Sequence, residues 1–117
     1  MARHVSMNQR LSDLSTPRRA LVRLFQAINF GQVVGLTIEN GDPVFHPEPT
    51  VLVDLKLDGN TETRQEADLL DFELRDEVRK LIAHLDEIRN GRIERIEIRS
   101  GIPRRIIIER RLTQESL

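Results

Sequence analysis

Residues 91–111 have the sequence GRIERIEIRSGIPRRIIIERR. Residues 95–99, RIEIR, alternate between charged and apolar side chains, which is the pattern of a strand with one buried face. The Ser100-Gly101 dipeptide marks a turn, and a second apolar run follows Pro103. The segment therefore predicts two strands, 92–99 and about 104–111, joined by a turn.

A version of this segment occurs 60 residues earlier in the chain. Aligning residues 21–43 with residues 81–103 gives six identities, which fall in the apolar helix stripe, the strand and the turn. Packing and backbone geometry constrain these positions, so the sequence predicts an internal duplication of one α-β-β unit. The alternative is that two unrelated α-β-β units share the same packing positions. The identical pairs are Leu21/Leu81, Ile28/Ile88, Gly31/Gly91, Ile38/Ile98, Gly41/Gly101 and Pro43/Pro103.

The first unit is predicted to begin with a helix over about 17–29. Ser15-Thr16-Pro17 supplies hydroxyl groups that can cap the free N–H groups, followed by a proline at the first helical position. An apolar stripe at helical spacing follows. We expect Gly31 to adopt the left-handed conformation that often ends a helix.

A strand follows this helix and leads into a hairpin. Asn40-Gly41 is the strongest short hairpin signal, because both residues tolerate positive φ. Val33 and Ile93 have the opposite parity to the apolar residues after them, which predicts either a bulge or burial beneath the end of the preceding helix. The residues expected to face the core from the first strand are Val34, Leu36 and Ile38.

The return strand is expected to begin near residues 43–45 and to resume over residues 50–57. The His46-Pro47-Glu48-Pro49 segment interrupts it, because proline cannot donate to a ladder. Over residues 50–57 the alternation predicts one buried face and one wet face. The residues expected to be buried are Val51, Val53, Leu55 and Leu57, and those on the wet face are Leu52, Asp54, Lys56 and Asp58.

The second helix is predicted to begin between Asp68 and Asp71, where carboxylates suit the positive end of the helix dipole. It is expected to end before Gly91. The polar residues before it form a turn-rich segment that predicts an exposed loop. The apolar stripe of the helix consists of Leu74, Val78, Leu81, Ile82, Leu85 and Ile88.

Together these elements predict an α+β fold made of tandem α-β-β repeats. The repeats form one antiparallel sheet of four or five strands with two helices packed on one face, because one unit alone cannot cover its apolar layer. At 117 residues we expect a single domain. Its predicted parts are a flexible arm (1–14), the domain (15–112) with repeat one (17–57), a loop (58–67) and repeat two (68–111), and a tail (113–117).

The helix–Gly–strand–Gly–strand pattern over residues 88–109, with Gly91 and Gly101, resembles a short bacterial domain of unknown function. The run from Phe25 to Phe45, which contains Asn29-Phe30-Gly31, is similar to part of small uncharacterised bacterial proteins. The resemblance implies the order of elements and a bacterial origin. It transfers no functional residues to this chain.

Composition indicates a protein of the cytoplasm. The chain has no cysteine, which fits a reducing compartment and excludes disulfides and thiolate metal sites. It has no apolar run long enough to span a membrane. The net charge of −1 conceals basic ends around an acidic middle, because residues 1–30 carry +4, residues 31–88 carry −9 and residues 89–111 carry +5. These regions either neutralise one another or display a basic face.

Residue patterns typical of catalysis or metal binding are not found in the sequence. His46 has only Glu48 as a neighbouring ligand, and His84 lies among polar helix residues, whereas a metal site needs three or four ligands. No serine lies in a nucleophile elbow. The glycines follow the helices instead of preceding them, which is the reverse of a phosphate-binding loop. We therefore expect no enzyme activity, no cofactor and no small-molecule substrate.

Arginine-rich segments over residues 18–23 and 92–111 are the remaining signal. They could contact phosphates, but glutamates interleave with them and the chain has no Trp or Tyr to stack on bases. The alternative is a solvated sheet face with cross-strand ion pairs. The candidate contact residues for nucleic acid or a protein partner are Arg18, Arg19, Arg95, Arg99, Arg104, Arg105 and Arg111.

An open sheet with helices on one side leaves free edges and a bare face. We therefore predict a small protein-interaction module, with homodimerisation as its simplest form and another protein as the other partner. Nucleic-acid binding through the arginine-rich segments is the alternative function.

Overall fold

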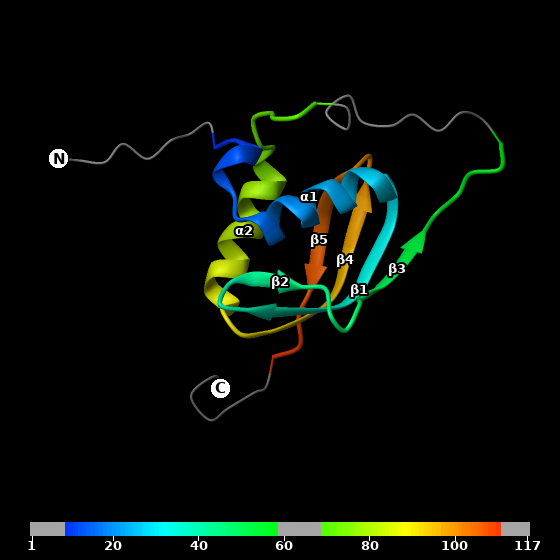
Figure 1. Ribbon diagram of the computed structural model, residues 1–117. Helices are drawn as coiled ribbons and strands as arrows, with labels where there is room; N and C mark the ends of the chain where they lie inside the picture. The colour runs from blue at the N-terminus through cyan, green and yellow to red at the C-terminus, as the bar shows by residue number, and fades with distance from the viewer. Residues whose placement is uncertain (1–8, 59–68, 111–117) are drawn as a thin grey trace.

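The computed structural model describes residues 9–58 and 69–110 of the 117-residue chain. Its described part contains two α-helices and a five-stranded antiparallel sheet (Figure 1). The α+β fold class predicted from the sequence is confirmed. In chain order the elements are a short 3₁₀ turn (Leu11–Asp13), α1 (Thr16–Ile28), β1 (Phe30–Glu39), β2 (Asp42–Val44), β3 (Thr50–Val53), α2 (Asp76–Ile88), β4 (Gly91–Arg99) and β5 (Ile102–Ile107).

The central pair of the sheet is β1 and β4. The strand order is β2-β1-β4-β5, and β3 also pairs with β1. The outer edge of β1 is divided, because Gly31 to Val34 pair with β3 and Thr37 to Glu39 pair with β2. Both helices pack their apolar stripes against the inward side chains of β1 and β4 to form one core.

Helix α1 begins where the sequence predicted. The Ser15 hydroxyl accepts a hydrogen bond from the Arg18 N–H at 3.3 Å, and Pro17 lies in the first turn. The predicted cap at Gly31 is wrong. The residue with positive φ at the helix end is Asn29 (φ 64°), whose N–H bonds the Phe25 carbonyl, while Gly31 already belongs to β1. Arg89 has the same backbone conformation at the corresponding end of α2, with a φ angle of 59°.

Helix α2 begins at Asp76, later than the predicted start between Asp68 and Asp71. Phe72 and Leu74 are buried in an extended segment before it, which pairs with the N-terminal part of the chain. The Leu11 N–H donates to the Phe72 carbonyl at 2.9 Å, and the Leu74 N–H donates to the Gln9 carbonyl at 2.8 Å. These backbone contacts hold residues 72–74 extended and delay the helix.

The structure places residues 9–14, which the sequence analysis assigned to a flexible arm, against the core. Leu11 and Leu14 are buried in the same cluster as the helix stripes. The first eight residues of that arm, the tail over 113–117 and most of the predicted loop lie outside the described residues.

Both predicted hairpin turns are present. Asn40 and Gly41 have φ angles of 53° and 80°, and Ser100 and Gly101 have φ angles of 57° and 73°. Positive φ at both central residues is the signature of the type I′ turn, whose twist matches that of the flanking strands. Strand β5 begins at Ile102, two residues earlier than predicted.

The parity change of Val33 and Ile93 has a common cause. Val33 lies opposite Ile96 and Leu36 lies opposite Ile93, and all four side chains are fully buried. Between these pairs the ladder omits Gly35 and its facing residue Glu94, without a change of register. One residue of each strand is thus left out of the pairing. In both strands the inward-facing residues therefore change from odd-numbered before this point to even-numbered after it. Val34 consequently lies on the outer side and is half-buried, contrary to the prediction that it faces the core.

The two α-β-β units correspond at an offset of 60 residues. Helices α1 and α2 have the same length and start 60 residues apart. The Gly41 N–H donates to the Arg89 carbonyl at 2.8 Å, and the Gly101 N–H donates to the Asn29 carbonyl at 2.8 Å. Each turn is thereby attached to the helix end of the other unit. Internal duplication, which would account for this correspondence, stays a prediction.

Strand β3 differs most from the prediction. It covers only Thr50–Val53, and its side chains are exposed, as are the apolar residues that follow. The Asp54 N–H donates to the Phe30 carbonyl at 2.7 Å, which is the start of β1. Beyond this point β1 offers no further partner and the core ends, so the expected burial of Val51, Val53, Leu55 and Leu57 is wrong.

Gly31 permits the contact between β1 and β3. A Cβ atom there would lie 2.0 Å from the Leu52 carbonyl oxygen. Gly31→Ala should therefore separate β3 from β1 and lower the free energy of unfolding by about 2 to 4 kcal/mol. Gly91→Ala at the corresponding position of the other unit is the control. Its Cβ would meet only the Ile88 side chain at 3.1 Å, so a change of less than about 1 kcal/mol is expected in urea unfolding. Equal losses in the two variants would contradict this explanation.

Candidate interaction surface

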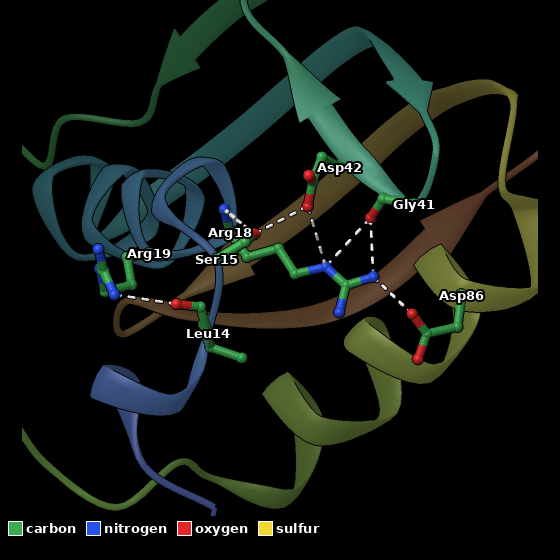
Figure 2. A network of polar contacts seen from close by, with 7 residues as sticks. All are labelled: Leu14, Ser15, Arg18, Arg19, Gly41, Asp42 and Asp86. Carbon is green, nitrogen blue, oxygen red and sulfur yellow. Dashed lines mark hydrogen bonds and ion pairs between the residues drawn. The ribbon is translucent and has the colours of Figure 1, made fainter.

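Arg18 connects three elements and is largely enclosed by them. Its Nε and Nη2 atoms donate to the Gly41 carbonyl oxygen at 3.1 and 2.8 Å, and Nη2 pairs with Asp86 of α2 at 2.5 Å (Figure 2). Nε also lies 3.5 Å from Asp42, and the side chain is only 16% exposed. Arg18 therefore fixes α1 to the β1–β2 turn and to α2, and its Nε and Nη2 donors are used within the chain.

Arg19 is likewise engaged locally. Its Nη1 donates to the Leu14 carbonyl at 2.9 Å, and its Nη2 donates to the Thr16 hydroxyl at 3.0 Å. The Leu14 contact is visible in Figure 2. Arg79 makes the matching contact with the Leu74 carbonyl in the second unit, at 3.0 Å. The arginine therefore closes the turn that precedes the helix.

The remaining candidate arginines that the structure describes lie on and beside the outer face of the sheet. Arg105 of β5 faces Glu97 of β4, with 3.7 Å between Nε and Oε2, and Arg104 pairs with Glu77 of α2 at 3.0 Å. Arg95 donates to the side chain of Gln32. The charges on this face thus alternate in sign, and exposed pairs of this kind contribute about 0 to 1 kcal/mol each.

Arg99 differs from these arginines. It is exposed at the end of β4, and no hydrogen bond or ion pair joins its side chain to another described residue. It lines a shallow depression of 390 Å³, together with Leu52 and Val53 of β3. Arg111 lies outside the described residues.

His46 and His84 are both exposed. The Nδ1 atom of His84 lies 3.3 Å from Glu87, three residues later on the same helix. Within residues 9–58 and 69–110 no group of three or more His, Cys, Asp or Glu side chains is placed to hold a metal ion. No helix in this part of the chain is long and apolar enough to cross a membrane.

Asp71 fastens the N-terminal segment to the chain that leads into α2. One oxygen accepts from Arg10 Nε at 2.8 Å, and the other accepts from the Ser12 N–H at 2.9 Å. The Arg10 guanidinium, aided by Ser12, lowers the pKa of the Asp71 carboxyl to about 2. The sequence predicted a role for this carboxylate at the helix start, whereas it holds residues 10–12.

Apolar exposure is concentrated on one segment, which we call the β3 arm (residues 50–57). Eight large apolar side chains are exposed among the described residues, and five of them lie within residues 51–57. Exposure rises along the arm from 39% at Val51 to 74% at Leu55 and 99% at Leu57. The arm extends away from the helices and the rest of the sheet (Figure 1). The sequence indicated its alternation, but placed its apolar face in the core.

The two edges of the sheet differ in their protection. The edge strand β5 carries the exposed Arg104 and Arg105, and its pairing with β4 shifts register between Glu97 and Ile98. Charged side chains and bulges discourage a further strand from adding to an edge. The β3 arm has no such shift in its pairing with β1. Strand β3 itself, Thr50–Val53, also carries no charged side chain, so it is the less protected edge strand.

The chain matches no family model, no curated protein and no solved structure. The resemblance to a bacterial domain accordingly stays a prediction, and the functional argument rests on the geometry above.

Removal of the Arg18 side chain should destabilise the fold. It should not impair binding to a partner. Arg18→Ala leaves the Gly41 carbonyl and Asp86 without their shared donor, so the free energy of unfolding should fall by about 1 to 3 kcal/mol. Arg99→Ala is the matched control and should change it by less than about 0.5 kcal/mol. Chemical denaturation of both variants measures the difference. Unchanged stability in Arg18→Ala would show that this contact network is dispensable.

The lowered pKa of Asp71 predicts an acid-sensitive contact. Because the folded-state pKa is about 2 and the ordinary value is 3.8, the carboxylate stabilises the folded state above pH 3.8. That contribution disappears as the pH falls from about 4 towards 2. Thermal unfolding across this range should therefore give a steeper loss for the wild type than for Asp71→Asn. Glu48→Gln, at an exposed loop position, should follow the wild type. Parallel curves for wild type and Asp71→Asn would contradict the assignment.

Proposed function

We propose that the protein is a non-enzymatic protein-interaction module that self-associates through the β3 arm. The observation that supports this is the exposure of five large apolar side chains on one short segment, which begins as strand β3. Contiguous apolar surface of this kind is typical of interaction sites, because water contact with it is unfavourable. The proposed setting is the cytoplasm of a bacterium, as the resemblance and the lack of cysteine suggest.

The chemistry of the arm favours a strand as its partner. Val53, Leu55 and Leu57 share one parity, and Asp54 and Lys56 share the other, so one face is apolar and the other polar. Addition of a strand would place its apolar side chains beside those of the arm on the same face and satisfy backbone groups that lie beyond the end of β1. Full burial of one leucine or valine side chain contributes about 1.5 to 3 kcal/mol. Several such side chains could offset the cost of association.

Nucleic-acid binding is the alternative function. Of its candidate residues, Arg18 and Arg19 already bond to backbone carbonyls, and Arg104 and Arg105 pair with glutamates. Only Arg99 combines exposure with the lack of a side-chain partner among the described residues. A strongly salt-dependent affinity for DNA or RNA would favour this alternative over self-association.

Disruption of the arm should abolish self-association. Sedimentation velocity or light scattering over a range of concentrations should show a dimer for the wild type and a monomer for Leu55→Asp, because a carboxylate would replace an apolar contact. Ile107→Asp on β5 is the control, since Ile107 is also an exposed apolar residue of the sheet, at 38%. It should remain dimeric. A monomeric wild type would refute the proposal, and a monomer only in Ile107→Asp would assign the interface to β5.

A further inference from the structure

The sequence of the β3 arm restricts how two copies can meet. We propose that two arms pair antiparallel about a two-fold axis at Leu55, with Asp54 of each copy opposite Lys56 of the other. This inference rests on the proposed self-association and names its partner and register. It is built on residues 52–58, all of which the structure describes. Strand β3 ends at Val53 and Leu57 and Asp58 lie in a bend, so the proposed pairing extends the strand conformation of the arm to these residues.

Symmetry sets the direction of pairing. A closed dimer of identical chains uses the same patch on both subunits, related by a two-fold axis. Two copies of one strand that meet at such an axis, perpendicular to their sheet, run antiparallel. One edge of β3 is occupied by Gly31 to Val34 of β1, and among the described strands no other strand occupies its second edge. The second copy therefore approaches along that free edge.

Side-chain parity then limits the register. Residues directly opposite each other in an antiparallel pair point to the same face of the sheet. Four of the five exposed apolar residues of the arm are odd-numbered, namely Val51, Val53, Leu55 and Leu57. The even-numbered positions hold Leu52 and the charged residues Asp54, Lys56 and Asp58. The apolar faces coincide only when odd positions oppose odd positions. This requires the axis to pass through a residue position, not between two residues.

Charge selects among the registers that remain. An axis at Asp54 would place that carboxylate against itself, and an axis at Lys56 would oppose two ammonium groups. An axis at Val53 would pair no charges. With the axis at Leu55, Asp54 and Lys56 form two opposite-charge pairs, which stabilise a sheet, whereas like charges destabilise it.

The register centred on Leu57 also pairs opposite charges. Apolar contacts distinguish it from the register centred on Leu55. An axis at Leu57 would oppose Lys56 to Asp58, but it would place Leu55 opposite Gly59, which has no side chain. An axis at Leu55 brings the two Leu55 side chains together and places Val53 opposite Leu57 in both copies. These residues are between 52% and 99% exposed, so a large apolar surface would be removed from water.

The position of Leu55 permits this approach. The last backbone contact between the arm and β1 is the bond from the Asp54 N–H to the Phe30 carbonyl. Leu55 and the residues after it lie beyond this bond and are exposed. A second copy can therefore pair with them without displacing a strand of the first.

Disulfide trapping tests the register, because the chain contains no natural cysteine. Directly opposed residues of an antiparallel pair have Cα atoms about 4.5 to 5.5 Å apart, which suits a disulfide. Leu55→Cys should form cross-linked dimers under mild oxidation. Leu70→Cys, at a 96% exposed position outside the arm, is the control and should cross-link only slowly. A mixture of Val53→Cys and Leu57→Cys should give the mixed dimer in preference to either symmetric one.

Charge exchange gives an independent measurement. Asp54→Lys and Lys56→Asp should each weaken the dimer by about tenfold or more, since each places like charges opposite one another. A mixture of the two variants should form heterodimers, because lysines of one chain then oppose aspartates of the other. The double variant should regain wild-type affinity to within a few fold. Arg92→Glu, an exposed charge exchange on β4, should leave the affinity unchanged.

The outcomes separate the register from the function. A dimeric wild type whose Leu57→Cys variant cross-links fastest, or whose charge variants are not rescued by mixing, would overturn the register and leave self-association intact. A wild type that stays monomeric and does not cross-link at Leu55→Cys overturns both proposals. Rapid Leu55→Cys cross-linking with rescue of the mixed charge variants supports both.

Discussion

Strands β1 and β4 pair so that Val33 lies opposite Ile96 and Leu36 lies opposite Ile93, with all four side chains fully buried. Every other described strand attaches to one of these two, since β2 and β3 pair with β1 and β5 pairs with β4. The buried side chains of both helices belong to the same core cluster as these inward residues. A single helix–strand–strand unit would leave this apolar layer half uncovered, and each unit therefore depends on the other for its core. The backbone bonds from each turn glycine to the helix end of the opposite unit reinforce this dependence.

The two units differ most after the hairpin turn. In the second unit β5 continues along β4 for Ile102–Ile107. In the first unit β2 ends at Val44, and the proline-containing segment 45–49 separates it from β3, which pairs with the other half of the same strand. This detour shifts β3 towards the beginning of β1 and directs the rest of the arm past the end of the sheet. The recurring residues are thus scaffold, whereas the exposed apolar arm belongs to the first unit alone.

The sequence predicted correctly those features that depend only on interactions between residues close together in the chain. The Ser15 cap, the Asn40-Gly41 turn and the helix stripes depend on a few neighbouring residues, and the structure contains them. The prediction failed where distant segments decide the outcome. The sequence placed Asp71 at a helix start because its partner Arg10 is 61 positions away. It placed one face of the β3 arm in the core because periodicity indicates amphipathic character, but does not indicate whether a core lies close enough to cover that face. Among the candidate arginines, sequence could not separate Arg18, which is enclosed by backbone and carboxylate partners, from the exposed Arg99.

A free edge with apolar side chains is a hazard as well as a binding site, because any extended chain can add to it. At β5 the hazard is reduced by Arg104 and Arg105 and by the shift in pairing. In the proposed dimer the charges of the β3 arm reduce the same hazard in another way. Asp54 and Lys56 lie two residues apart on one face, so registers centred on either residue oppose like charges, while the register between them opposes unlike charges. In the proposed dimer these two charged residues disfavour the registers centred on them, and the apolar contacts around Leu55 distinguish the proposed register from the one centred on Leu57.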